Sequence, residues 1–147
     1  MPSIMLPITL TTAGATALIA LWLAIRTGGS RRAAQVSIGD GGDPKLICRM
    51  RAQANFVEYA PFIVILIGLI EVSCGSSLWL WIASTAFLVA RILHPLGMDG
   101  MRAGRAIGTS ITFILLLGLG LYAISLPLLA KHDSAPKVIE TTVPPAG

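Results

Sequence analysis

Four long apolar segments dominate the pattern of hydrophobic and polar positions along the chain. Each is close to the roughly 20 residues that an α-helix needs to cross a bilayer core about 30 Å thick. The segments run from Leu6 to Ile25, from about Leu46 to Ser73, from Ser77 to about Leu96, and from Ala106 to Ala130. The first and the last carry no charge, whereas Arg91 interrupts the third. The pattern predicts an all-α integral membrane protein whose four transmembrane helices form one bundle.

The composition excludes an ordinary soluble domain. Hydrophobic residues make up 54% of the 147 residues and charged residues only 12%, whereas soluble domains carry about 25% charged residues. The first segment has no Lys or Arg before it and is about twice as long as the apolar part of a signal peptide, so we expect a transmembrane span. We therefore expect one membrane domain over residues 1–130 and a polar, disordered tail over residues 131–147.

The positions of the basic residues explain the net charge of +4 without nucleic-acid binding. Six of the eleven Lys and Arg residues lie between the first and second segments or just inside the second, and three more flank the connection between the third and fourth. By the positive-inside rule, these two connections are cytoplasmic. Both termini are then expected on the non-cytoplasmic side, as an even number of spans requires.

Neither a disulfide nor a metal site is expected. Cys48 and Cys74 stand roughly 39 Å apart along a helix that rises 1.5 Å per residue, while a disulfide requires Cα atoms within about 7 Å. The Gly-rich stretch from Ser37 to Pro44 lacks the Lys-Ser/Thr pair of a P-loop and the ligand spacing of an EF-hand. We expect a loop that ends with Asp43 as a helix N-cap and Pro44 as the first helical residue.

Two features of the fourth segment concern charge and packing. Arg102 and Arg105 are three positions apart, so they share a helical face if the helix begins before the apolar run. Farther along, Gly118 and Gly120, together with Ser110 and Thr112, are small residues of the kind that allow two membrane helices to approach closely. These residues predict a tight helix–helix contact there.

A polar stripe crosses the start of the second segment. Arg51, Asn55, Glu58 and Tyr59 stand at positions i, i+4, i+7 and i+8, which places them on one side of a helix. Because an ionised residue in lipid is costly, the stripe should face protein or a water-filled cavity. The combination of two opposite charges, an amide and a phenol suits a zwitterionic or carboxylate-bearing ligand. The alternative is that Arg51 and Glu58 are partners in an interhelical polar network that only holds the bundle together.

The run from Arg51 to Pro61, RAQANFVEYAP, resembles the signature of the MAPEG family, the membrane-associated proteins in eicosanoid and glutathione metabolism. The resemblance extends from the Arg31-Arg32 pair through the Gly-rich loop, which is similar to that of the bacterial members, to Ala90-Arg91 and residues 102–105. It implies a trimer of four-helix bundles in a bacterial inner membrane. It also implies glutathione as a co-substrate, bound between neighbouring subunits near the cytoplasmic face.

The resemblance assigns roles to the polar stripe. Arg51 and Asn55 would hold carboxylate and backbone groups of glutathione, Glu58 would bind its α-ammonium group, and Tyr59 would add a polar contact. Gln53 lies on another face of the same helix and would reach the glutathione of the neighbouring subunit.

Two further basic positions complete the site that the resemblance implies. Arg31, or its neighbour Arg32, would also contact the glutathione of the adjacent subunit. Arg105 matches the arginine that activates the thiol, which makes it the candidate catalytic residue. The chain departs from the eukaryotic enzymes on the third helix, where His94 and Met98 replace tyrosines that close over glutathione. His94 can still donate a hydrogen bond, whereas Met98 cannot.

Two functions follow from these expectations. The first is a glutathione transferase or peroxidase that uses the thiol of glutathione to conjugate or reduce lipophilic electrophiles, as in detoxification. The second is a non-catalytic membrane scaffold or regulatory binding protein that keeps the fold, which the loss of the third-helix tyrosines favours.

Overall fold

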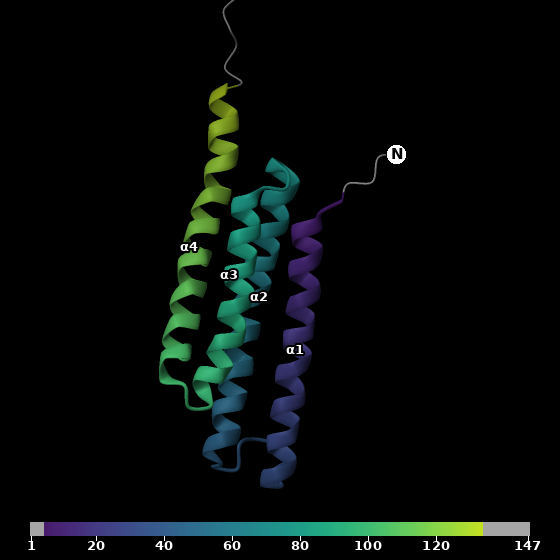
Figure 1. Cartoon of the computed structure of the whole chain (residues 1–147), viewed down its shortest axis with the longest axis vertical. Coiled ribbons are helices and arrows are strands. Elements are labelled where there is room, and N and C mark those ends of the chain that lie inside the picture. Colours follow the sequence, from purple (N-terminus) through teal and green to yellow (C-terminus); the bar gives the residue numbers. More distant parts are fainter. Residues whose placement is uncertain (1–4, 134–147) are drawn as a thin grey trace, which may run out of the picture.

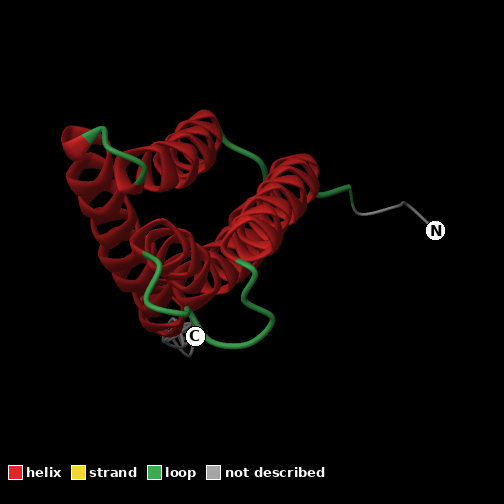
Figure 2. Ribbon diagram, turned by 90° about the horizontal axis from the view of Figure 1, so that it is seen from below, coloured by secondary structure: helices red, strands yellow, loops and turns green. Residues whose placement is uncertain are grey.

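The computed structural model describes residues 5–133, which form an antiparallel bundle of four helices (Figure 1). The chain alternates in direction, so the α1–α2 loop and the α3–α4 turn lie at one end of the bundle and the α2–α3 turn lies at the other. Every described element is a helix or a loop (Figure 2), and all four helices are long and apolar enough to span a membrane. The predicted transmembrane four-helix fold is confirmed. The helices are α1 (Pro7–Ala34), α2 (Pro44–Cys74), α3 (Leu78–Met98) and α4 (Arg102–Asp133).

Helix α1 is longer than its apolar segment. It continues from Ile25 to Ala34 and ends at Gln35, which has a left-handed φ of 55° and donates its N–H to the carbonyl of Arg32. The added turns carry Arg31 and Arg32 near the C-terminus of the helix, where cations interact favourably with the helix dipole. Hydropathy marks where the membrane-compatible stretch ends, and the helix itself continues into the basic region.

The starts of the second and fourth helices follow the sequence signals. Asp43 caps α2 as predicted, accepting a 2.6 Å hydrogen bond from the backbone N–H of Leu46. Helix α4 begins at Arg102, before the apolar run, which puts Arg102 and Arg105 on one helical face. It continues to Asp133, three residues past the expected end of the membrane domain, and the rest of the expected disordered tail lies outside the described residues.

The packed core is narrow and most large apolar side chains face outward. Exposed side chains include Leu18, Phe62, Leu69 and Leu117, as expected of helices whose outer surface meets lipid or another subunit. The core is formed by one side of each helix, and its buried members include Ile8, Leu23, Phe56, Ile63, Ile67, Leu80, Phe87 and Leu119.

Glycines bring α3 and α4 into backbone contact at the end of the bundle near their turn. A Cβ on Gly97 would overlap the backbone nitrogen of Arg105, and one on Gly108 would lie 2.7 Å from the carbonyl oxygen of Ala90. By contrast, a Cβ on Gly118 or Gly120 would meet nothing within 4 Å. Among the described residues, the close contact expected of this set is therefore not made at Gly118 and Gly120, whereas Thr112 does contact Arg91 of α3. The close contact between α3 and α4 lies nearer their turn, at Gly97 and Gly108.

A buried carboxylate from α2 caps the start of α1. Glu71 is 2% exposed and accepts hydrogen bonds from the backbone N–H groups of Ile8 and Thr9 and from the hydroxyls of Thr9 and Ser76, at 2.6–3.0 Å. The first N–H groups of a helix have no partner within the helix, and carboxylates are favoured beside them. Glu71 was not singled out from the sequence because the helix start that it caps, at Ile8 and Thr9, is 63 and 62 positions away.

We expect Glu71→Gln to lower the free energy of unfolding by about 1–3 kcal/mol and so to lower the melting temperature. The amide keeps one acceptor oxygen but turns an NH2 group toward groups that are themselves donors. The measurement is thermal unfolding in detergent, followed by circular dichroism. Ser73→Ala is the matched control, since the exposed Ser73 hydroxyl bonds only to Leu69 within its own helix. Equal melting temperatures for the two variants would contradict the capping role of Glu71.

Candidate functional site

The polar stripe of α2 divides into two exposed charges and two anchored side chains. Arg51 and Glu58 are exposed, whereas Asn55 and Tyr59 are half-buried. The Tyr59 ring packs edge-on against Phe113 of α4, with 5.4 Å between ring centroids. Among the residues whose side chains the structure describes, the only ion pairs are those that Asp99 makes with Arg26 and Arg49. Within that part of the chain, Arg51 and Glu58 form no ion pair with another helix, as the alternative of a bundle-holding polar network would require.

Asn55 is held by Arg91, which belongs to the part of the third segment that resembles the family but was given no role in the site from the sequence. The Arg91 side chain is 1% exposed, and its Nη1 donates to Asn55 Oδ1 at 3.0 Å. Its Nη2 donates to the carbonyl oxygen of Gly108 at 3.2 Å and to Thr112 Oγ1 at 2.5 Å. The signal was available in the sequence, since a lone arginine in an apolar span must find acceptors within the protein.

His94 lies between α3 and α4 and connects the two helices close to Arg105. Its Nδ1 lies 3.1 Å from Thr109 Oγ1, and the Thr109 hydroxyl donates to the carbonyl oxygen of Arg105 at 2.9 Å. The side chain of His94 is buried, while that of Arg105 is exposed in the first turns of α4. The backbone contact at Gly97 fixes the position of Arg105 beside α3.

Arg31 and Gln53 lie apart from the polar stripe of α2. Both line a cleft of about 570 Å³ between α1 and α2, together with Thr27, Met50 and Val57. Arg31 donates to the carbonyl oxygen of Gly39 at 2.7 Å and contacts Met50 Sδ at 3.5 Å. The α1–α2 loop therefore holds the guanidinium of Arg31 at the rim of this cleft.

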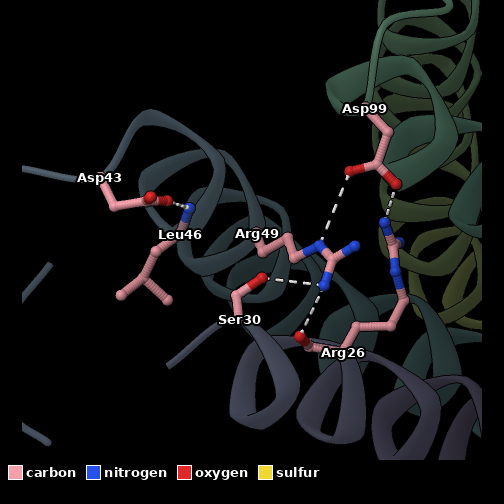
Figure 3. A network of polar contacts seen from close by, with 6 residues as sticks. All are labelled: Arg26, Ser30, Asp43, Leu46, Arg49 and Asp99. Atoms are coloured by element: carbon pink, nitrogen blue, oxygen red, sulfur yellow. Dashed lines mark hydrogen bonds and ion pairs between the residues drawn. The ribbon is translucent and has the colours of Figure 1, made fainter. Parts of the chain in front are cut away.

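An ionic network joins three helices at the basic end of the bundle (Figure 3). Asp99, just after α3, forms an ion pair with Arg26 of α1 and lies 4.0 Å from the Nε of Arg49 on α2. Arg49 also donates to Ser30 Oγ at 2.8 Å and to the carbonyl oxygen of Arg26 at 3.0 Å. None of these residues was a candidate from the sequence, and the network supports the end of the bundle at which the site residues gather.

The described residues offer groups for an organic ligand rather than for a metal. Among the side chains that the structure describes, no cluster of three His, Cys, Asp or Glu residues could bind an ion. Arg51, Glu58 and the Asn55 amide offer a cation, an anion and a neutral polar group along one side of α2. This arrangement can bind a small molecule that carries carboxylate and ammonium groups. A nearby exposed arginine, Arg105, can stabilise an anion such as a thiolate.

The sequence model of the MAPEG family matches residues 9–125, which include all eight candidate site residues. No curated protein matches the chain. The family match covers most of the chain and all four helices.

Proposed function

Because this chain belongs to the MAPEG family, we propose that it is a glutathione transferase or peroxidase that conjugates or reduces lipophilic electrophiles. Family membership indicates a role in glutathione or eicosanoid metabolism. The observation that carries the finer proposal is the pair of opposite charges on α2: Arg51 and Glu58 are exposed on one side of the helix and have no ion-pair partner within the described chain. Glutathione supplies both missing partners, since it carries carboxylates and an α-ammonium group.

The proposed chemistry takes place where two phases meet. The basic loops place the site residues near the cytoplasmic face by the positive-inside rule, and we propose a bacterial inner membrane with both termini on the opposite side. A water-soluble thiol reaches this boundary from the cytoplasm, while the apolar electrophile reaches it through lipid. Holding both there replaces a rare encounter between phases with a local one. Arg105 is the proposed catalytic residue and stabilises the thiolate.

We propose that the active form is a homotrimer with the site at the subunit boundary. A charged side chain that faces lipid costs about 2.5–3.5 kcal/mol or more, so the exposed Arg51 and Glu58 favour a covering surface. The cleft that holds Arg31 and Gln53 lies elsewhere on the same chain. A neighbouring copy can therefore bring these two residues to the ligand held by Arg51, Asn55, Glu58 and Tyr59, and the site is incomplete without it.

We expect chemical crosslinking in native membranes to give dimers and then trimers, and to stop at trimers. The reason is that a closed ring of three covers each charged stripe with the Arg31 cleft of a neighbour. The measurement is a crosslinker titration followed by denaturing gel electrophoresis. Saturation at the dimer would contradict the proposed assembly.

We expect Glu58→Gln to weaken glutathione binding by about ten- to a hundredfold and to leave the fold intact. The carboxylate loses its charge-assisted hydrogen bond to the ligand ammonium, which is worth roughly 1.5–3 kcal/mol. The measurement is calorimetry with the purified protein in detergent. Glu58→Asp, which keeps the charge, should retain more of the affinity than Glu58→Gln. Unchanged affinity together with loss of assembly would mean that Glu58 serves structure alone.

A non-catalytic membrane scaffold or regulatory protein is the second candidate. Two observations favour it: His94 is committed to Thr109 between α3 and α4, and Met98 offers no hydrogen-bond donor. The two candidates differ in turnover. A scaffold would bind glutathione weakly or not at all and would conjugate none of a panel of electrophiles after reconstitution in lipid, whereas the proposed enzyme would conjugate or reduce at least one.

A further inference from the structure

Arg91 is a buried cation without a carboxylate partner. Its three acceptors, Asn55 Oδ1, the Gly108 carbonyl and Thr112 Oγ1, are all neutral. Its buried Nε has no hydrogen-bond partner among the described residues. The positive charge is therefore compensated by dipoles alone, in a part of the bundle where an unpaired charge is costly.

The contact with Arg91 decides which side of the Asn55 amide is available to a ligand. A guanidinium group only donates hydrogen bonds, so the amide must turn its oxygen toward Arg91. The NH2 group of Asn55 is then the part left for other partners. Because Arg91 is also bound to two groups of α4, its guanidinium cannot swing away and release the amide.

We propose that Arg91 is a positioning residue that fixes Asn55 as a hydrogen-bond donor and so makes the adjoining subsite select a ligand carboxylate. This inference rests on the proposed function, which supplies glutathione as the ligand. A carboxylate accepts the NH2 group of Asn55 and also brings negative charge toward the uncompensated Arg91. Arg51, one helical turn before Asn55, adds a second cation on the same side of α2.

Thr112 is itself fixed in place as an acceptor for the Arg91 guanidinium. Its hydroxyl donates to the Gly108 carbonyl at 2.7 Å, which leaves the oxygen lone pairs to accept from Arg91. Gly108 is required beside it, because a Cβ there would lie 2.9 Å from the backbone nitrogen of His94. The close α3–α4 crossing thus supplies the acceptors that hold Arg91, and Arg91 in turn holds Asn55 of α2.

The test measures glutathione binding to the full-length protein in lipid nanodiscs by calorimetry. Two analogues accompany glutathione, each with one carboxylate replaced by a carboxamide. Wild type should bind one analogue at least tenfold more weakly than glutathione, because a carboxamide offers a weaker acceptor and competing donors. Asn55→Asp keeps an acceptor for Arg91 but loses the NH2 group, so it should lose at least tenfold in glutathione affinity and discriminate against that analogue less.

Substitutions at Arg91 separate positioning from simple bracing of the helices. Arg91→Leu should weaken glutathione binding about tenfold or more and abolish the preference over the analogue, while Arg91→Lys, also a donor-only cation, should restore part of both. In a double-mutant cycle with Asn55→Leu, the losses in affinity should be strongly non-additive. Thr12→Val is the matched control, since it removes a buried 2.5 Å contact with Ser84 between α1 and α3. It should lower stability without changing ligand preference.

Three results would overturn the inference: equal wild-type affinity for glutathione and both analogues, additive effects in the cycle, or unchanged preference in a folded Arg91→Leu protein. If wild type binds no glutathione, the proposed function fails, and a ligand-free measurement then decides the inference. In the ligand-free protein, the carbonyl carbon and amide nitrogen chemical shifts of the Asn55 side chain should show an amide oxygen that accepts a charge-assisted hydrogen bond in wild type. These shifts should move toward the values of a freely solvated amide in Arg91→Leu. Identical amide signals in both proteins would refute the positioning role.

Discussion

Arg105→Ala is expected to lower the turnover of glutathione conjugation by one or more orders of magnitude while glutathione affinity changes much less. A free thiol has a pKa of about 8.5, so only a few per cent is thiolate at neutral pH. A fixed cation beside the sulfur shifts that balance toward the reactive anion. Arginine is suited to this role because it stays charged at a boundary of low dielectric constant. In the proposed site most of the groups that hold glutathione are on α2, so the loss should appear in turnover.

The assay combines two measurements on the same preparations. Thiolate absorbance of bound glutathione is followed in the ultraviolet as pH is varied, and conjugation rates are measured with a reactive aryl halide. Wild type should hold thiolate at lower pH than Arg105→Ala, and Arg105→Lys should lie between the two. If wild type and Arg105→Ala titrate together and react equally, Arg105 only anchors the cytoplasmic face.

Gly97→Ala is expected to cause the largest loss of stability of any single methyl group added to this chain. The new Cβ would overlap the backbone nitrogen and Cα of Arg105, which cannot move aside as a flexible side chain can. Overpacking of this kind costs about 1–3 kcal/mol and more where backbone must shift. The variant should melt at a clearly lower temperature and also lose turnover, because α4 and the Arg105 it carries are displaced.

Gly118→Ala is the matched control for this prediction. Both glycines are inside helices, but a Cβ on Gly118 would meet nothing within 4 Å. Alanine is also the better helix former by about 1 kcal/mol. The melting temperatures of the two variants, measured in the same detergent, should therefore shift in opposite directions from that of wild type or differ from each other by several degrees. Similar melting temperatures would mean that α3 and α4 do not pack as closely at Gly97 as the structure indicates.

Much of the fold could be predicted because the relevant signals are local. Apolar runs long enough to span a bilayer identify the helices, and the Asp43-Pro44 pair marks the start of α2. The end of α1 could not be predicted from hydropathy, because hydropathy records where the lipid-compatible residues stop, while α1 continues as a helix through Arg31 and Arg32. The contact at Gly97 was missed because the small residues of one helix do not reveal which of them meets a partner.

In the candidate site, too, the features set by local sequence could be predicted and the contact between distant residues could not. The stripe of Arg51, Asn55, Glu58 and Tyr59 follows from helical spacing, since residues four apart share a face. The partner of Asn55 did not follow, because Arg91 is 36 positions away and reaches it only when α3 packs against α2. A general rule could have drawn attention to Arg91: a charge inside a membrane helix needs a named partner, and this span contains no acidic residue.

The cap that Glu71 provides has a consequence for biosynthesis. Its oxygens bind the backbone of Ile8 and Thr9 from 63 and 62 positions away, so the start of α1 leaves the ribosome long before its cap has been made. At about 5–20 residues per second, the delay lasts several seconds. Until then the first amides of α1 must be satisfied by water at the membrane surface. The α1–α2 hairpin is thus the smallest translation product in which the N-terminus of α1 can be capped by Glu71. Until this hairpin forms, the insertion machinery holds α1 without its cap.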